Sequence, residues 1–177
     1  MSKVAVIGAG YVGITTAACF AHLGHTVTCG DIDAEKVGRL AKAEIPILEE
    51  GLPALVAQGL ESGRLRFVVG ATDAARNADF VFLCVPTPQG DNGAADLSFV
   101  EAAAREIAPI LSPDTVVVNK STMPVGSTEL VARVLGHAGA VNAIGVASNP
   151  EFLREGHAVR DFLNPSRVVI GCDDTSG

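Results

Sequence analysis

Short apolar runs alternate along the chain with longer stretches in which apolar residues recur at helical spacing. Residues 3–8 are dominated by Val and Ile and end at a glycine, which predicts a buried strand. Residues 11–24 have helical spacing and stop at Gly24, a favourable residue at a helix C-terminus. Further strands are predicted at 26–31, 66–69, 79–85, 114–122, 143–149 and 166–172. Further helices are predicted at 33–43 with Asp33 as the cap, at about 53–62, at 97–111 and at 127–136.

This regular order of strands and helices predicts the fold class. The strands are apolar at consecutive positions, as expected of strands that are buried on both faces of a sheet. We therefore expect an α/β fold of the Rossmann-like, doubly wound kind, in which a mostly parallel sheet has helices on both faces. The chain has 177 residues, 48% of them hydrophobic. That length suits one domain, over residues 1–177, and is short for two.

Charge and hydropathy exclude two classes of partner. The net charge is −7 and no run of basic residues occurs, so nucleic acid is not an expected partner. The apolar stretches are strand-sized, well short of the roughly 20 residues that span a bilayer, so no membrane partner is expected either. Residues 1–10 enter a strand at once and contain no signal-peptide cleavage region, which predicts a cytoplasmic protein.

The cysteines and histidines do not form a recognisable metal site. Cys19, Cys29, Cys84 and Cys172 are widely scattered and include no CxxC pair, and the four histidines lack HxxxH spacing. We expect the cysteines to be small buried apolar residues in a reducing compartment, and we expect no bound metal.

The first predicted strand is followed by a glycine pattern that is typical of dinucleotide sites. Gly8, Gly10 and Gly13 form GxGxxG between a strand and a helix. The first glycine allows a tight turn, the second lets a pyrophosphate approach the backbone, and the third lets the helix pack against the strand. The free N–H groups at the start of the helix, around Tyr11 and Val12, would then face the phosphates.

Asp31 ends the second predicted strand, 23 residues after Gly8. At that place a carboxylate can accept hydrogen bonds from the adenosine ribose, and its neighbours are Ile32 and Asp33 with no arginine. A 2′-phosphate would meet two acids there, which favours NAD over NADP as the cofactor. The alternative is that Asp31 only caps the next helix, a role for which Asp33 competes.

The segment "NPEFLREG", residues 149–156, places two glutamates four residues apart. On a helix Glu151 and Glu155 would share one face, where like charges oppose each other by a few tenths of a kcal/mol. The arrangement suggests a site rather than a surface turn. The alternative is a solvated helix start, at which acids complement the helix dipole.

Several segments resemble the nucleotide-sugar 6-dehydrogenases, and most closely the UDP-glucose 6-dehydrogenases. The GDP-mannose dehydrogenases are the nearest competing group. The similar segments cover nearly the whole chain and are "GAGYVG" (8–13), "PILEEGLP" (46–53), "CVPTPQGDNGAADLSFV" (84–100), "NKSTMPVGST" (119–128) and "NPEFLREGHAVRDFLNPSRVVIG" (149–171). The resemblance implies an enzyme that oxidises the C6 alcohol of UDP-glucose to a carboxylate, with two NAD and one water, to give UDP-glucuronate.

The resemblance also implies roles for particular residues. Asp31 and Lys36 would contact the adenosine side of NAD, although Lys36 could instead be a solvated helix lysine. Thr87 and Thr122 would lie along the cofactor; alternatively, Thr122 only satisfies backbone donors near a turn. The cofactor set is therefore Gly8, Gly10, Tyr11, Val12, Gly13, Asp31, Lys36, Thr87, Thr122 and Glu155.

For the sugar side, the resemblance implies that residues 151–155 touch the sugar nucleotide. These are Glu151, Phe152, Leu153, Arg154 and Glu155. Glu151 would activate the water that hydrolyses a thioester intermediate, and Glu155 would lie near the nicotinamide. The catalytic set implied in this chain is Thr122, Glu151 and Glu155.

Nothing in the chain matches the family's glycine-flanked catalytic cysteine, its catalytic lysine, its central helix or its second nucleotide-binding domain. We therefore expect an N-terminal portion of a longer enzyme that is a homodimer or a higher oligomer, and a fragment that binds NAD without completing the oxidation. Two alternatives remain open. One is a β-hydroxyacid dehydrogenase, and the other is a non-catalytic NAD-sensing regulatory module.

Overall fold

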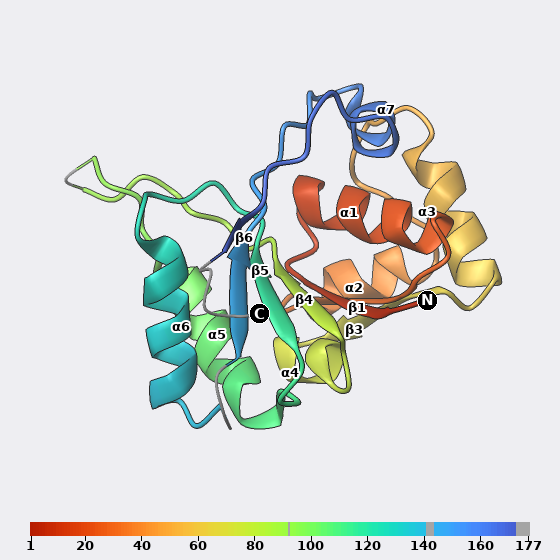
Figure 1. Ribbon diagram of the computed structural model, residues 1–177. Helices are drawn as coiled ribbons and strands as arrows, with labels where there is room; N and C mark the ends of the chain where they lie inside the picture. The colour runs from red at the N-terminus through yellow and green to blue at the C-terminus, as the bar shows by residue number, and fades with distance from the viewer. Residues whose placement is uncertain (92, 141–143, 173–177) are drawn as a thin grey trace.

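The computed structural model describes residues 1–91, 93–140 and 144–172. Its centre is one seven-stranded sheet with the strand order β3-β2-β1-β4-β5-β6-β7 (Figure 1). All neighbouring strands are parallel except β6 and β7, which are antiparallel. The strands are β1 (Lys3–Ile7), β2 (Thr26–Asp31), β3 (Leu65–Val69), β4 (Phe80–Leu83), β5 (Val116–Asn119), β6 (Gly145–Ser148) and β7 (Gly171–Cys172).

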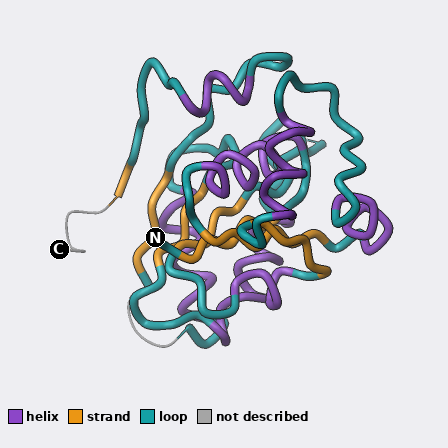
Figure 2. Tube along the Cα trace, turned by 90° about the vertical axis from the view of Figure 1, so that its right-hand side faces the viewer, coloured by secondary structure: helices purple, strands orange, loops and turns teal. Residues whose placement is uncertain are grey.

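Helices cover both faces of this sheet, and Figure 2 shows them on the two sides of the band of strands. On one face lie α1 (Tyr11–His22), α2 (Ala34–Leu40) and α3 (Leu52–Glu61). On the other face lie α4 (Ala71–Ala75), α5 (Ser98–Ile107), the short 3₁₀ helix η1 (Ala108–Ile110) and α6 (Ser127–His137). A last helix, α7 (Ala158–Leu163), packs beside α1. The predicted α/β, Rossmann-like, doubly wound fold is confirmed.

The central strands explain why the chain forms two cores. In β1, Val4 and Val6 face the core beneath α1, and Ala5 and Ile7 face the core beneath α4 and α5. All four are buried, so this strand lacks the polar alternation of a half-exposed strand. The chain leaves β1 toward the face of α1 and leaves β4 toward the opposite face. These two strands are neighbours, so their carboxyl ends form the crevice in which such sheets bind ligands.

Several predicted boundaries were wrong. The helix predicted at 33–43 ends at Leu40, and Ala43 has the left-handed φ of +60°. The strand predicted at 166–172 is reduced to Gly171–Cys172 and runs antiparallel, because its apolar residues meet neither sheet neighbour nor core: Val168 is 64% exposed and Ile170 67%. The first residue of the strand predicted at 143–149 lies outside the described residues.

Two helices were missed. The helix α4 has only five residues, too few for apolar spacing to be recognised. The helix α7 follows "NPEFLREG" and has only six residues. Its first backbone N–H, that of Ala158, donates to Glu49, which is distant in sequence, so no local residue marks the start of this helix.

The cysteines partly follow the prediction. Cys19, Cys29 and Cys84 are buried, but Cys172 is exposed at the sheet edge, so the prediction of a buried thiol was wrong there. Within the described residues, no helix is both long and apolar enough to cross a membrane.

Candidate cofactor and substrate site

The glycine loop between β1 and α1 is built by close backbone contacts. Gly8 has φ +100°, and a Cβ on it would lie 2.7 Å from the carbonyl oxygen of Cys84 at the end of β4. A Cβ on Gly13 would lie 1.8 Å from the carbonyl oxygen of Gly8. Gly10 differs, because its Cβ would meet nothing within 4 Å in the described part of the chain. Gly8 and Gly13 are therefore required by packing, whereas Gly10 leaves the approach to the loop open.

The start of α1 completes this loop. Gly10 is the N-cap residue and supplies no side-chain cap, and the first turn carries no acidic residue. The first N–H groups of any α-helix have no partner within the helix, and they carry the positive end of its dipole. The loop and the helix start therefore fit a pyrophosphate, which needs backbone donors and close approach.

Asp31 lies at the end of β2, directly beside this loop. Its Oδ2 accepts hydrogen bonds from the N–H of Ala9 at 2.8 Å and from Nζ of Lys36 at 3.1 Å. Its Oδ1 accepts the N–H of Asp33 at 3.0 Å. Burial raises the pKa of Asp31, but these three hydrogen bonds outweigh it and hold the pKa below its ordinary value. Asp31 is therefore an anion whose Oδ1 keeps acceptor capacity for a ribose hydroxyl.

The alternative role of Asp31, to cap the next helix, is filled by Asp33. Asp33, as predicted, caps α2 by accepting the N–H of Lys36 at 3.0 Å. Lys36 does not behave as a freely solvated lysine, because its ammonium is paired with Asp31 and its side chain is only 35% exposed. Asp31 is thus held by the glycine loop through Ala9 and by Lys36 of α2, while the capping of α2 is left to Asp33.

The loops after β4 and β5 meet at the same edge of the sheet. The hydroxyl of Thr87 donates to the carbonyl oxygen of Thr122 at 2.9 Å. The backbone N–H groups of Lys120 and Ser121 both donate to the carbonyl oxygen of Leu83. Two residues predicted along the cofactor, Thr87 and Thr122, are therefore brought into contact beside the crevice at the end of β4.

The segment 149–156 is not helical, so the prediction that Glu151 and Glu155 share a helix face was wrong. Residues 151–154 have no regular structure, and a turn follows at 155–157. The carboxylate of Glu151 accepts the N–H of Leu153 at 2.6 Å, a local bond that competes with helix formation. Gly156 then takes φ +82°. The two glutamates consequently face different surroundings.

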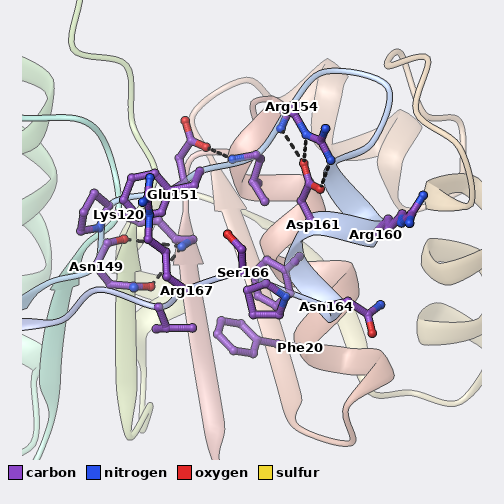
Figure 3. A pocket seen from close by; sticks show the side chains of 16 residues that line it. Phe20, Lys120, Asn149, Glu151, Arg154, Arg160, Asp161, Asn164, Ser166 and Arg167 are labelled. Carbon is purple, nitrogen blue, oxygen red and sulfur yellow. Dashed lines mark hydrogen bonds and ion pairs between the residues drawn. The ribbon is translucent and has the colours of Figure 1, made fainter.

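Glu151, Phe152, Leu153 and Arg154 line a cavity of about 670 Å³ between this segment, the end of β5 and α7 (Figure 3). Glu155 does not line it. The cavity also contains the cations Lys120, Arg160 and Arg167. Arg154 is held by a bidentate pair with Asp161, at 2.9 and 2.7 Å, and the guanidinium of Arg167 lies over the ring of Phe152 at 4.8 Å. The cavity is therefore lined with more cations than anions.

Lys120 lies in the site although it is not among the predicted site residues. It is only 5% exposed, and its Nζ donates to Oδ1 of Asn149 at 3.0 Å and lies 5.8 Å from the ring centroid of Phe162. Burial lowers its pKa, against the opposing effects of Cys84 and Glu151. Lysine is almost never buried without a partner. A lysine only two residues after the apolar run 116–118 was the signal that could have identified it.

The doubly wound sheet, the glycine loop at the start of α1 and the anionic Asp31 after β2 together define an NAD-binding domain of the Rossmann type. Residues 2–177 match the family model described as "UDP-glucose/GDP-mannose dehydrogenase family, NAD binding domain". The chain belongs to this family, and its cofactor is NAD. The family match does not support the alternative of a β-hydroxyacid dehydrogenase.

Named relatives and solved structures agree with the family. A UDP-glucose 6-dehydrogenase of Rhizobium meliloti is 50% identical over 177 residues, which are 99% of this chain and 40% of that protein. A Pseudomonas aeruginosa protein of the same name is 46% identical, over 98% of this chain and 39% of its own length. The structure of a UDP-glucose dehydrogenase from Pyrobaculum islandicum matches with a TM-score of 0.94 and 44% identity, over 99% of this chain and 41% of that one.

A GDP-mannose dehydrogenase structure from Pseudomonas aeruginosa, solved as a ternary complex, matches with a TM-score of 0.92 and 34% identity, over 99% of this chain and 42% of that one. The chain therefore spans about two fifths of the length of the relatives it matches.

Proposed function

We propose that this chain is the cofactor-binding part of an NAD-dependent nucleotide-sugar 6-dehydrogenase. The complete enzyme would convert UDP-glucose, two NAD and water into UDP-glucuronate and two NADH. NAD supplies the hydride acceptor for each of the two oxidations. The part described here would bind the cofactor and form one wall of the sugar site.

One contact carries this proposal. The hydroxyl of Tyr11, in the first turn of α1, lies 3.1 Å from the carbonyl oxygen of Arg154. The glycine loop and the segment 151–154 are therefore neighbours, although 143 residues separate the two partners. A cofactor on the glycine loop and a ligand in the cavity lined by 151–154 would be adjacent, as a hydride transfer requires.

The chain's own residues would then have separate tasks. Gly10, Tyr11 and Val12 would receive the pyrophosphate through backbone donors, and Asp31 with Lys36 would hold the adenosine ribose. Thr87 and Thr122 would border the nicotinamide end, together with Glu155.

Glu151 suits the role of a general base for water, because its carboxylate lines the cavity and takes part in no ion pair among the described residues. Its hydrogen bond from the N–H of Leu153 uses only Oε2, so Oε1 is available for a water molecule. The segment Phe152–Leu153–Arg154 would contact the sugar nucleotide through its backbone and side chains.

The charge of the cavity supports an anionic substrate. Lys120, Arg160 and Arg167 lie in its lining, and a diphosphate prefers such a cluster of cations. UDP-glucose is favoured over GDP-mannose because the relatives at 50% and 46% identity are named UDP-glucose 6-dehydrogenase, whereas the GDP-mannose dehydrogenase structure is 34% identical. GDP-mannose is the second candidate substrate.

The wider setting of the enzyme is also a proposal. The resemblance favours a cytoplasmic homodimer or higher oligomer, with the catalytic cysteine and lysine outside these residues. The alternative of a non-catalytic NAD sensor gives no reason for the cationic cavity beside the cofactor loop.

The test uses the complete gene product and this chain in parallel. The complete enzyme should produce two NADH for each UDP-glucose, followed by NADH absorbance, and should act at least about tenfold less efficiently on GDP-mannose. This chain alone should release heat on binding NAD and should produce no NADH. Absence of NAD binding, or a complete enzyme that oxidises neither sugar nucleotide, would refute the proposal.

A further inference from the structure

Glu49 is a buried carboxylate that no part of the proposed chemistry uses. It lies in the loop between α2 and α3 and is 5% exposed, whereas the adjacent Glu50 is exposed. Carboxylates are almost never fully buried unless they are paired. In Glu49 the pairing is with hydrogen-bond donors and not with a cation, because none of the ion pairs formed by the described residues includes it.

Both oxygens of Glu49 accept hydrogen bonds from elements that are distant in sequence. Oε2 accepts the hydroxyl of Tyr11 at 2.8 Å and the N–H of Gly156 at 2.8 Å. Oε1 accepts the N–H of Ala158, the first residue of α7, at 2.7 Å. Burial raises the pKa of Glu49, but these donors and the N–H of Val159 outweigh it and keep the pKa below its ordinary value.

Tyr11 is the other half of this contact. Its hydroxyl hydrogen is shared between Glu49 and the carbonyl oxygen of Arg154. Burial, followed by the hydrogen bond to Glu49 and the charges of Glu49 and Glu155, raises the pKa of the phenol, against an opposing effect of the Gly156 backbone. The phenol is therefore a neutral donor at physiological pH.

The hydrogen-bond partners of Glu49 lie in two places: at the proposed cofactor loop and beside the proposed sugar-contacting segment. Tyr11 lies in the first turn of α1, where the pyrophosphate would approach. Arg154, Gly156 and Ala158 lie in the segment that borders the sugar cavity and in the helix that follows it. Glu49 is bonded to both ends at once, and each bond to a charged acceptor is stronger than a neutral one.

We propose that Glu49 is a positioning residue that holds the cofactor loop and the sugar-contacting segment in one relative position through Tyr11, and so couples the binding of NAD to that of the nucleotide sugar. This inference rests on the proposed function, because it requires both ligands to bind at these two segments. A ligand that orders either segment orders the other in part, so the second ligand binds more tightly.

A purely structural role would leave a different signature. If Glu49 only capped α7, the replacement Tyr11→Phe would have little effect on ligand binding, because Phe keeps the ring, the backbone and the bonds from Glu49 to Gly156 and Ala158. If Glu49 couples the two segments, Tyr11→Phe and Glu49→Gln should affect the coupling alike. Glu50→Gln is the matched control, since it removes the same charge one residue away on the exposed side.

The first measurement uses the spectroscopy of this chain. Tyr11 is the single tyrosine and the chain contains no tryptophan, so tyrosine emission reports on this phenol alone. A carboxylate that accepts the hydrogen bond of a phenol quenches its emission. Glu49→Gln should therefore raise the emission above that of the wild-type chain, and Glu50→Gln should leave it unchanged. Equal emission from all three proteins would show that the Glu49–Tyr11 bond does not exist and would overturn the inference.

The second measurement determines the coupling in the complete enzyme. The dissociation constant of NAD is measured by calorimetry with and without saturating UDP-glucuronate, the nucleotide-sugar product, so that no oxidation takes place during the titration. In the wild type and in Glu50→Gln, UDP-glucuronate should tighten NAD binding at least about fivefold. In Tyr11→Phe and Glu49→Gln, the factor by which the nucleotide sugar tightens NAD binding should approach one. An unchanged factor in Tyr11→Phe would overturn the inference even if Glu49→Gln failed to fold. A wild type that bound no NAD would instead defeat the proposed function.

Discussion

The ammonium of Lys36 lies 3.1 Å from the carboxylate of Asp31, and the same carboxylate oxygen accepts the N–H of Ala9 inside the glycine loop. The acid proposed to hold the adenosine ribose is thus oriented by the loop proposed to hold the pyrophosphate. Loop and acid are thus joined by a hydrogen bond at the ends of β1 and β2. This arrangement leads to the first prediction.

Replacing Asp31 by Asn should weaken NAD binding by about tenfold, because a charged acceptor for the ribose becomes a neutral amide and Lys36 loses its partner. Binding of NADP should weaken less, since the charge that repels a 2′-phosphate is removed. Calorimetry with both cofactors measures the two effects. Asp33→Asn is the control for NAD: Asn caps a helix as well as Asp, so the affinity for NAD should not change. Equal losses of NAD affinity in the two variants would contradict the role of Asp31.

Gly10 and Gly13 should respond differently to alanine. Gly10 has φ −82° and open space around its Cβ position, so Gly10→Ala should fold with a thermal midpoint close to that of the wild type. Its new methyl group would occupy the approach to the loop and should weaken NAD binding by about tenfold or more. Gly13→Ala would place a Cβ 1.8 Å from the carbonyl oxygen of Gly8 and should destabilise the fold itself. Calorimetry and thermal unfolding monitored by circular dichroism separate these outcomes. If Gly10→Ala bound NAD as tightly as the wild type, the phosphate would not approach at this residue.

Lys120 should make stability depend on alkaline pH. Its pKa in the folded chain is below the ordinary lysine value of 10.5, so the unfolded state holds the proton more tightly. The charged form therefore costs folding free energy at neutral pH, and this cost is relieved as the pH rises through the lowered pKa. The free energy of unfolding of the wild type should rise, relative to that of Lys120→Met, between neutral pH and 10.5.

Urea denaturation at several pH values measures this difference. If the difference in free energy of unfolding between the wild type and Lys120→Met stayed constant with pH, folding would not lower the pKa of Lys120. In the complete enzyme, Lys120→Met should also weaken UDP-glucose binding by about tenfold, on the scale of one lost charge-assisted hydrogen bond.

The cysteines should differ sharply in reactivity. Burial raises the pKa of Cys19 and of Cys84 to about 12, and Cys29 is also buried with a raised pKa, so these three thiols should resist alkylation in the native protein. Cys172 is exposed and should be modified first. Counting iodoacetamide adducts by mass spectrometry should give one adduct in the native chain and four after denaturation. Cys172→Ser should give none in the native state, and rapid modification of any other thiol would contradict the burial.

Most of the fold could be predicted because the central strands carry their own signal. The strands β1 and β2 consist largely of residues buried on both faces, and Asp33 marks the start of α2 by a bond only three residues long. The misplaced last strand has a tertiary cause. Val168 and Ile170 have strand-like chemistry, but a strand also needs a neighbour, and the pairing with β6 extends only over Gly171 and Cys172.

The candidate site also has one part that the sequence predicts and one part that it does not. The glycine spacing and the acid after β2 could be recognised locally, since the order strand, loop and helix brings them together in every sheet of this kind. The conformation of "NPEFLREG" could not, because Glu151 bonds to the N–H of Leu153 and Gly156 bonds to a loop 107 residues away. Spacing alone cannot distinguish a helix from an irregular segment held by such bonds.

The sequence by itself determined that this protein is an NAD-binding domain, because Gly8, Gly10 and Gly13 lie between the first strand and the first helix and an acid ends the next strand, and this local order is the pattern of dinucleotide sites. Only the tertiary structure decided which polar groups are buried and what they touch. Glu49 looks like an ordinary surface residue in the sequence, yet folding removes its carboxylate from water and gives it partners from other elements. The position of Lys120 after an apolar run suggests burial, but its partner, Asn149, comes from another element. The partner of a long-range hydrogen bond, and the burial that strengthens it, are set by which elements meet in space.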